Sequence, residues 1–402
     1  MTPPKVALLS SVYAPEVVGG AERVVQTIAE GLASDGFEPV VITLNPTQTA
    51  SVDVLNGVTV HRIAMPNIYW PFAQESHGFA HRAIWHARDA YNRRAGRAVA
   101  EILDAEAPDI VNTHNIAGFS VSVWNAAVTA GVPLVHTVHD QYLLCPRTTM
   151  FRDGENCEAQ CGSCRLFTAP GTHFSGHPQV VTGPSQFILD RHVEHGWFRD
   201  TTRRVVRNAQ VANSGDVTRE SGDGEDPLRF GFLGRLAETK GLDRLLQAFV
   251  DLPEGSAELV IGGTGEPGYE RSLRRIAGDR GDIHWLGFID PATLLDQIDV
   301  LVVPSTWDDT APLVVLEAFA HQRPVIGANR GGIPELVALG DGWIVDPDDR
   351  AGFTARLLDC IERRGQLAEL GHRCRDASLE LTIEGMLDGY RDAYRASGTR
   401  GF

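Results

Sequence analysis

Two positively charged side chains follow the apolar run Leu228–Leu233 and precede an amphipathic helical pattern. They are Arg235 and Lys240, and Lys240 is one of only two lysines among the 36 basic residues. Arg235 offers a planar fork of N–H donors and Lys240 a compact point charge, a combination suited to a diphosphate whose negative charge grows as it departs. The alternative is a surface ion pair. The position directly after a strand disfavours it, because ligands of doubly wound domains bind at the carboxyl ends of strands.

Two carboxylates lie eight residues apart further along the chain, on either side of Pro312. The spacing predicts that Asp309 stands in a loop at a strand end and that Glu317 lies one or two turns into the next helix. Placed in this way, they can accept hydrogen bonds from two sets of sugar hydroxyls, those of a ribose and those of a transferred hexose. The alternative is that an acid near the start of the helix complements its dipole.

Glycines occupy two loops that could approach a phosphate. Gly19 and Gly20 directly precede a helical pattern, where backbone N–H groups free of side chains can bind an anion, although a glycine pair is also an ordinary turn signal. Gly263, Gly265 and Gly268 form a literal G-x-G-x-x-G after a strand, the fingerprint of dinucleotide oxidoreductases. This second signal is weak, because Pro267 interrupts it and it lies in the middle of the chain.

Four of the six cysteines cluster within 20 positions. Their C-x11-C-x3-C-x2-C spacing predicts a structural zinc site that pins a long loop, formed by Cys145, Cys157, Cys161 and Cys164. An iron-sulfur cluster uses the same ligands and is the less favoured alternative, and unligated or redox-active thiols are a third. The cluster follows His139 closely, so its order would shape the acceptor side of a site.

The segment from residue 64 to 97 is rich in aromatic residues, histidine and arginine. Such a segment is typical of contact with a membrane interface or with an anionic acceptor. The alternative is a solvated helix face, which is the usual role of a run of charges.

Elements that alternate between strand and helix must position these residues. Strand-like runs at 6–9, 39–44, 110–113, 134–138 and 180–182 alternate with helical patterns at 21–34, 95–105 and 186–195. The rhythm begins again at residue 228, with apolar runs at 228–234, 257–263, 283–287, 300–305 and 324–328. This alternation predicts an α/β protein with two doubly wound, Rossmann-like domains.

A polar stretch from Asn208 to Pro227, rich in Gly, Asp, Ser and Asn, predicts the linker between them. We therefore expect a first domain at 1–212, completed by a C-terminal helix within 378–402, and a second at 213–377. The segment Leu379–Ala396 reads as a single final helix.

The composition excludes several classes of protein. With 402 residues, 43% hydrophobic and 22% charged, the chain is typical of a globular protein of two or three domains. Its net charge of −16 argues against a surface that binds nucleic acid. The N-terminus lacks the pattern of a signal peptide, and no apolar run is long enough for a membrane helix, so we expect a cytoplasmic protein, at most peripheral at the inner face of the membrane.

Taken together in order, these motifs resemble the retaining nucleotide-sugar glycosyltransferases of the GT-B fold, family 4. The resemblance covers nearly the whole chain and rests on GGAE at 19–22, TVHD at 137–140, GRLAETKG at 234–241, LGF at 286–288, PLVVLEA at 312–318 and GGIPEL at 331–336. It implies two Rossmann-like domains with a donor cleft between them. It also implies a nucleoside diphosphate sugar as donor and a sugar, lipid-linked or small-molecule acceptor, and it leaves the oligomeric state open.

The resemblance implies a role for each matched position. The catalytic candidates are Arg235 and Lys240 on the diphosphate, with His139 and Asp309 facing the sugar or the reacting centre. The donor-binding candidates are Gly19, Gly20, Gly234, Gly263, Phe288, Pro312, Leu313 and Glu317. The family usually has Glu where this chain has Asp309, which shortens the reach by one methylene.

The implied reaction moves a hexose to an acceptor hydroxyl with retention, in the biosynthesis of a polysaccharide, glycolipid or glycoside. No cofactor or metal is expected for catalysis, because Arg235 and Lys240 would stabilise the leaving group. His139 could be a general base or a buried structural partner of Asp140. The alternatives are a nucleotide-sugar epimerase on the same fold and a nucleotide-sugar-binding protein without catalysis.

Overall fold

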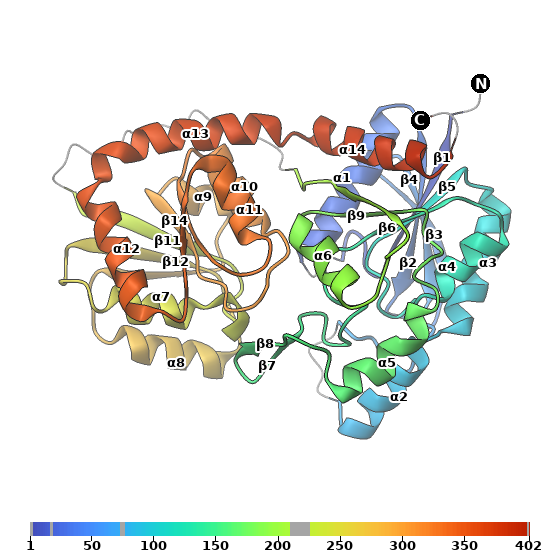
Figure 1. The fold of residues 1–402 in the computed structure, drawn as a ribbon, viewed down its shortest axis with the longest axis horizontal. Helices are drawn as coiled ribbons and strands as arrows, with labels where there is room; N and C mark the ends of the chain where they lie inside the picture. Colours follow the sequence, from blue (N-terminus) through green and yellow to red (C-terminus); the bar gives the residue numbers. More distant parts are fainter. Residues whose placement is uncertain (1–2, 17–18, 73–76, 210–225, 400–401) are drawn as a thin grey trace. The chain divides into compact units, whose positions relative to one another are not determined.

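A computed structural model describes residues 3–16, 19–72, 77–209, 226–399 and 402, and it divides into two compact units (Figure 1). The first unit contains Met1–Met150, Cys157–Asn208 and Ile383–Phe402, and the second contains Phe151–Asn156 and Ala209–Thr382. The short segment Phe151–Asn156 therefore leaves the unit that surrounds it in sequence. Most of the predicted linker lies outside the described residues.

The first unit is built on a sheet ordered β10-β9-β6-β5-β1-β2-β4-β3. Every pairing is parallel except that of β3 with β4. The strands are β1 (Lys5–Ser10), β2 (Glu38–Asn45), β3 (Ser51–Leu55), β4 (Val58–Ala64), β5 (Ile110–Thr113), β6 (Leu134–Thr137), β9 (Val180–Gly183) and β10 (Thr202–Val205). Five of them are almost wholly buried, as expected for a parallel sheet covered on both faces.

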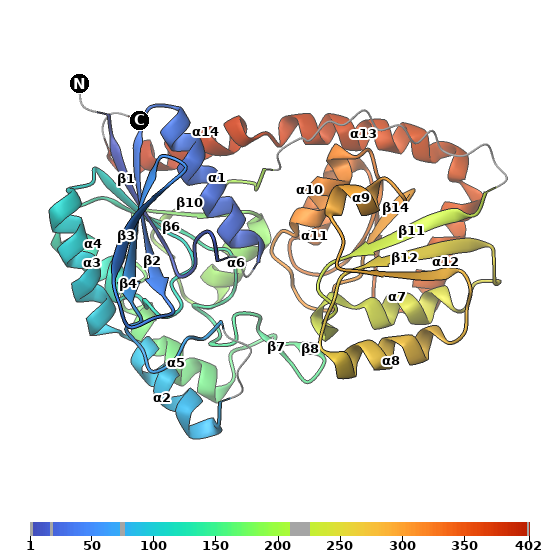
Figure 2. The same cartoon turned by 180° about the vertical axis from the view of Figure 1, so that it is seen from behind.

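Helices lie on both faces of this sheet (Figures 1 and 2). The helices of the first unit are α1 (Gly20–Ser34), α2 (Phe79–Asp89), α3 (Arg93–Glu106), α4 (Ser122–Thr129), α5 (Gly162–Thr172), α6 (Gln186–Glu194) and, from the far end of the chain, α14 (Ile383–Ala396). Of these, α2 and α5 extend away from the sheet at the lower end of Figure 1. The Tyr394 hydroxyl of α14 donates to Oδ1 of Asn112 on β5 at 3.0 Å, and Leu387 packs on Gly31 of α1. The C-terminal helix is thus part of the core of the first unit.

The second unit has an all-parallel sheet ordered β13-β12-β11-β14-β15-β16. Its strands are β11 (Leu228–Leu233), β12 (Ala257–Gly262), β13 (Ile283–Gly287), β14 (Val300–Val303), β15 (Val325–Ala328) and β16 (Trp343–Val345), with a separate hairpin of β7 (Phe151–Arg152) and β8 (Glu155–Asn156). The helices are α7 (Leu242–Phe249), α8 (Pro267–Ala277), α9 (Pro291–Leu295), α10 (Leu313–Ala320), α11 (Ile333–Val337), α12 (Arg350–Glu362) and α13 (Leu367–Glu380). Short 3₁₀ turns are η1 (Glu238–Lys240), η2 (Ala338–Gly340) and η3 (Arg364–Gln366).

These two sheets confirm the predicted fold class. In each, the first strand of the unit lies inside the sheet and the chain order reverses beside it, between β1 and β5 and between β11 and β14. Ligands of doubly wound sheets bind outside the carboxyl ends of the strands at this reversal. The loops after these four strands are therefore the places to examine for a site.

Two details differ from the sequence-based expectations. The single helix expected at Leu379–Ala396 is two helices, because the backbone leaves the helical region at Leu381 (ψ 50°) before the β-branched pair Thr382 and Ile383. The hairpin of β3 and β4 was not predicted. Its two-residue turn is Asn56–Gly57 with φ of 50° and 80°, an Asn-Gly signal typical of such hairpins.

Gly241 fixes the start of α7 against the end of β14. Its φ is +68°, and a Cβ at this position would lie 1.9 Å from the carbonyl oxygen of Pro304. Only glycine fits both the backbone angle and the contact. As a result, the preceding residue, Lys240, is held next to the loop that follows β14.

We predict that Gly241→Ala lowers the free energy of unfolding far more than Gly255→Ala does. Gly255 also has positive φ, +79°, but nothing lies within 4 Å of its added Cβ. The control should lose about 1 kcal/mol from backbone strain, and Gly241→Ala at least about 2 kcal/mol more from the clash. Denaturant unfolding measures both, and equal losses would show that the contact with Pro304 is unimportant.

Candidate functional site

In the second unit, Lys240 and Asp309 form an ion pair at the strand reversal. Lys240 Nζ lies 2.6 Å from Asp309 Oδ2 and 5.6 Å from the centre of the Trp307 ring. The Asp309 side chain is 8% exposed, whereas that of Lys240 is 32% exposed. The carboxylate is therefore largely desolvated and compensated by the ammonium group, which keeps one side open to solvent.

The loop that carries Asp309 is fixed by the glycine pair of GGIPEL. The N–H of Gly332 donates to the Asp309 carbonyl at 2.7 Å, and that of Gly331 donates to Asp308 Oδ1 at 3.1 Å. Gly331 has φ of +58°, and a Cβ there would lie 2.1 Å from the Asp309 carbonyl oxygen. The two motifs, far apart in sequence, thus form one backbone contact that orients the carboxylate.

The β7-β8 hairpin supports the same loop from the other side. Asn156 donates from Nδ2 to the Thr306 carbonyl at 2.8 Å, and its Oδ1 accepts from the Asp308 N–H at 2.9 Å. This bidentate amide contact explains why Phe151–Asn156 belongs to the second unit. Nothing in the spacing of the cysteines around it indicated this role.

The literal dinucleotide fingerprint has a packing explanation. A Cβ on Gly263 would lie 1.8 Å from the Gly234 carbonyl oxygen, and one on Gly265 would lie 2.0 Å from that of Leu236. The turns after β11 and β12 therefore touch backbone to backbone, which requires glycine. Gly268 lies in the first turn of α8, where its N–H donates to the N-cap side chain of Glu266.

The remaining predicted donor residues of the second unit follow the strands β11, β13 and β14. Arg235 is exposed directly after Gly234. Pro312 is the N-cap of α10 and Leu313 its first residue, and Glu317 is buried on the same helix. Phe288, just after β13, is 89% exposed. The structure brings Lys240 into direct contact with Asp309, but it shows no such contact for Phe288.

In the first unit, Gly19 and Gly20 begin α1. The N–H of Gly19 donates to Oε2 of Glu22 at 2.7 Å, which completes one arm of a capping box. Ser11, after β1, donates its hydroxyl to the carbonyls of Asn115 and Ala117 after β5, both at 2.7 Å. The loops after β1 and β5 are therefore tied together at this strand reversal.

His139 follows β6 and is paired with a second buried histidine. His139 Nε2 lies 2.9 Å from Nδ1 of His114, and burial lowers the pKa of His139 to about 4 and that of His114 well below its usual value. Burial raises the pKa of the neighbouring Asp140 to about 6, with a smaller contribution from Glu22, against the hydrogen bond from the Tyr142 N–H. His139 is thus neutral at pH 7, a poor general base but a suitable hydrogen-bonding group.

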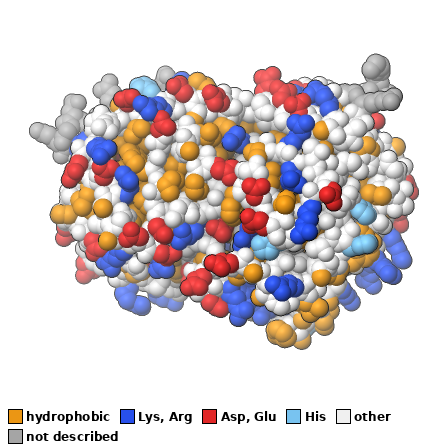
Figure 3. Space-filling model, viewed as in Figure 1, with side chains coloured by type: hydrophobic (Ala, Val, Ile, Leu, Met, Phe, Trp, Pro, Cys, Tyr) orange, Lys and Arg blue, Asp and Glu red, His pale blue; other side chains and the backbone are white. Residues whose placement is uncertain are grey.

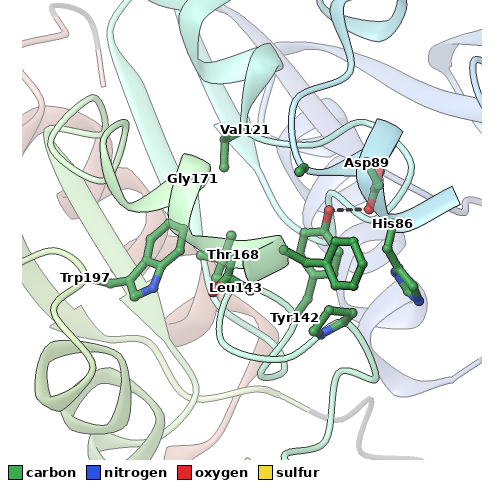
Figure 4. A pocket seen from close by; sticks show the side chains of 11 residues that line it. His86, Asp89, Val121, Tyr142, Leu143, Thr168, Gly171 and Trp197 are labelled. Carbon is green, nitrogen blue, oxygen red and sulfur yellow. Dashed lines mark hydrogen bonds between the residues drawn. The ribbon is translucent and has the colours of Figure 1, made fainter. Parts of the chain in front are cut away.

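A second buried carboxyl lies behind this loop. Asp89, at the end of α2, accepts from the Tyr142 hydroxyl at 2.5 Å and from the Gly118 N–H at 2.7 Å (Figure 4). Burial raises its pKa to about 7, although both hydrogen bonds act in the opposite direction. The contact lines a cavity of about 30 Å³ together with His86, Phe167 and Trp197. The hydrogen bond between Tyr142 and Asp89 connects the loop after His139 to α2.

The predicted zinc site is not supported. Within the described residues, no group of three or more His, Cys, Asp or Glu side chains is arranged to hold a metal ion. Cys145, Cys161 and Cys164 do lie together, but none of the four clustered cysteines forms a disulfide within the described residues. The loop is instead anchored by its own apolar residues, since Leu143, Leu144, Cys145 and Met150 belong to the core of the first unit.

Comparisons with known proteins match this architecture. The model of the family described as "Glycosyltransferase Family 4" matches residues 18–209, and that described as "Glycosyl transferases group 1" matches residues 227–363. D-inositol 3-phosphate glycosyltransferase of Rhodococcus jostii is 30% identical over 304 residues, which are 67% of this chain and 63% of that protein. The chain belongs to the family 4 glycosyltransferases.

Solved structures agree on the fold. Sucrose-phosphate synthase from Thermosynechococcus elongatus has a TM-score of 0.73 at 18% identity, covering 98% of both chains. Anabaena HepE in complex with UDP and glucose has a TM-score of 0.68 at 19% identity, covering 97% of this chain and 99% of that one. The glycosyltransferase therefore has the GT-B fold that its motifs predicted.

Sequence reasoning missed several residues around the site of this glycosyltransferase. Glu22 lies in the GGAE motif at 19–22, but its bond to the N-cap N–H could have been expected only by analogy, since glycine supplies one arm of a capping box. Trp307 lies two residues after the predicted strand at 300–305. Its buried indole Nε1 has no hydrogen-bond partner among the described residues. His114 and Asp89 carry no motif, because their partners come from segments 25 and 53 residues away.

We predict that wild-type stability falls relative to that of Asp89→Asn as the pH rises from 5 to 8. The folded pKa of Asp89, about 7, lies above its ordinary value of 3.8, so the folded state binds the extra proton. That stabilisation is complete below pH 4 and disappears as the pH passes 7. The difference should change by a few kcal/mol, at about 1.4 kcal/mol per pH unit.

Denaturant unfolding of both proteins across this range measures the effect. Tyr142→Phe is the control, because it removes one hydrogen bond and leaves the carboxyl to titrate. Parallel pH profiles for wild type and Asp89→Asn would refute the assignment of a raised pKa.

Proposed function

We propose that the protein transfers a hexose from a nucleoside diphosphate sugar to an acceptor hydroxyl with retention of anomeric configuration. The observation that carries the proposal is the partly exposed side chain of Lys240, fixed at the strand reversal of the second unit by Gly241 and Asp309. A cation there can bind the diphosphate of a donor. The complexes of the HepE neighbour with UDP and glucose support this class of ligand.

The proposed reaction needs charge stabilisation more than proton abstraction by the protein. The bond from the anomeric carbon to the diphosphate oxygen breaks, and the acceptor oxygen bonds to the same face of that carbon. The acceptor proton passes to the departing phosphate oxygen. Lys240 and Arg235 stabilise the negative charge on this leaving group, and such preorganised donors contribute most where charge develops.

Asp309 positions Lys240 in the proposed site. Asp309 has a shorter side chain than the Glu that is usual in the family, and at this length its carboxylate lies 2.6 Å from Lys240 Nζ. Glu317, buried on α10, and the N-terminus of that helix at Leu313 are the proposed contacts of the ribose and the donor. The neutral His139 is proposed to hydrogen-bond the sugar or the acceptor rather than to act as a base.

We predict that Lys240→Met lowers kcat about 100- to 1000-fold, the loss typical of removing one charge-stabilising donor. Transfer from a panel of nucleoside diphosphate sugars is measured, with the anomeric configuration of the product read by NMR. Arg350→Met is the control, because Arg350 belongs to the same unit and pairs with Asp251 in an exposed ion pair. It should retain wild-type activity.

A double variant separates catalysis from structure. Lys240→Met alone leaves the buried Asp309 carboxylate uncompensated, which can disturb the loop. Lys240→Met with Asp309→Asn removes that charge. If the double variant recovers activity, Lys240 acts only on Asp309 and the proposal fails. If the loss persists in a folded protein, Lys240 acts on the donor.

We further propose that the acceptor is presented at an anionic membrane surface, to which α2 and α5 attach. Phe79 and Ile84 on α2 and Leu166 on α5 are exposed, at 82%, 50% and 70%. The helices are neighbours, since the rings of His86 and Phe167 lie 5.6 Å apart. Exposed arginines accompany them, at positions 82, 88, 93, 94 and 97.

Figure 3 shows hydrophobic side chains at the lower tip of the lobe that carries these helices, with Lys and Arg side chains nearby. Apolar side chains beside arginines complement an anionic bilayer. No helix within the described ranges is long and apolar enough to cross a membrane.

We predict that the protein cosediments with phosphatidylglycerol vesicles and not with phosphatidylcholine vesicles. Phe79→Ser combined with Leu166→Ser should abolish binding, and Val54→Ser should not. Val54, 73% exposed on β3, is a matched apolar residue of the same unit. Equal binding by the two variants, or no binding to anionic vesicles, would contradict a membrane-presented acceptor and leave the transfer reaction to be judged by the Lys240 variants.

A further inference from the structure

Two thiols face each other at the start of α5. Cys161 is the N-cap residue of the helix and Cys164 lies in its first turn, with the two Sγ atoms 3.4 Å apart. A disulfide needs sulfur atoms at about 2.05 Å, so a closure of about 1.4 Å would join them. The N-cap backbone of Cys161 is extended (φ −69°, ψ 170°) and lies outside the helix, which leaves its side chain free to turn towards Cys164.

The two thiols differ in the way that thiol–disulfide exchange requires. Cys161 is partly exposed, and the two residues that follow it, Gly162 and Ser163, are exposed. The Cys161 Sγ lies 3.1 Å from the Ser163 hydroxyl in an exposed contact. The Cys164 Sγ lies between the sulfur atoms of Cys161 and Cys145, and its contact with Cys145 is partly buried. Cys161 is thus the attacking thiol and Cys164 the resolving one.

A third thiol competes for the same partner. Cys145 Sγ lies 3.5 Å from Cys164 Sγ, but Cys145 is 4% exposed and part of the core. An external disulfide cannot reach it. Cys360 and Cys374 are fully buried in the second unit and serve as internal controls.

We propose that Cys161 and Cys164 are a redox-modification site that a low-molecular-weight disulfide converts reversibly to an intramolecular disulfide. The Cys161 thiolate attacks one sulfur of the disulfide RS–SR, the S–S bond breaks, and RS⁻ leaves and takes a proton. The Cys164 thiol then loses its proton, and its sulfur attacks Cys161 Sγ and expels the second RS⁻. Two protein thiols are oxidised, and one disulfide is reduced to two thiols.

The test uses the full-length protein in glutathione buffers of increasing oxidised fraction. After the remaining thiols are alkylated, trypsin gives a peptide of residues 153–165 that contains Cys157, Cys161 and Cys164, whereas Cys145 lies in a separate peptide that ends at Arg147. We expect this peptide to lose two hydrogens, to carry one alkyl group, on Cys157, and to recover fully in reduced glutathione.

Variants identify the pair. Cys157→Ser, in the same peptide, should form the disulfide as the wild type does, and Cys161→Ser should abolish it. Cys164→Ser should stop at a mixed disulfide of Cys161 with glutathione. This accumulation distinguishes an attacking thiol from a merely structural one.

Three results would overturn the proposal. One is a disulfide that involves Cys157 or a cross-link to the Cys145 peptide as the main product. Another is four thiols that stay reduced at every glutathione ratio. The third is one zinc ion per chain in the purified protein, with the clustered thiols protected from alkylation until a chelator is added.

Discussion

The ion pair of Lys240 with Asp309 is the constraint on which the second unit's site depends. A carboxylate that is 8% exposed requires a compensating charge, and removing its partner would leave a buried charge unpaired. The pair forms only because the chain brings two loops together at the strand reversal. Gly241 allows contact with Pro304, and Gly331 allows contact with Asp309. The position of the cation is therefore fixed before any ligand arrives, which is the condition for electrostatic stabilisation of a leaving group.

Glycines in this unit are best understood through the backbone they touch. Gly263 and Gly265 match a dinucleotide fingerprint letter by letter, yet their hydrogen atoms face the carbonyls of Gly234 and Leu236. A fingerprint derived from sequence cannot distinguish a glycine that admits a ligand from one that admits another loop, because both requirements exclude a Cβ. Loop packing and ligand binding also occur in the same place. Both loops begin at the carboxyl ends of their strands, which is where ligands of doubly wound sheets bind.

The sequence was sufficient for the features that depend on local pattern. Buried strands such as 300–303, the helix that begins at Gly20 and the repeat of the doubly wound pattern follow from periodicity and turn residues. The ordered motifs predicted that Lys240 and Asp309 belong to one site, and the structure brings these two side chains into contact. What could not be predicted depends on distant contacts: the pairing of His114 with His139, the hydrogen bond of Tyr142 to Asp89 and the bond of Asn156 to the Asp308 loop. The zinc prediction is not supported for a related reason, because cysteine spacing gives no information about the apolar anchor that Leu144 and Met150 supply.

The chemistry of the first unit complements this arrangement. Burial keeps His139 and His114 neutral, and it raises the pKa of Asp140 and Asp89 towards neutrality. Histidines whose pKa lies this far below the operating pH have little capacity to take a proton from a hydroxyl at pH 7, since a general base works best when its pKa lies near that pH. They can still donate and accept hydrogen bonds. In the proposed reaction the departing phosphate takes the acceptor proton. The first unit then has to supply hydrogen bonds but no general base. The proposed transfer therefore requires hydrogen-bonding histidines from the first unit and the two cationic side chains Arg235 and Lys240 from the second.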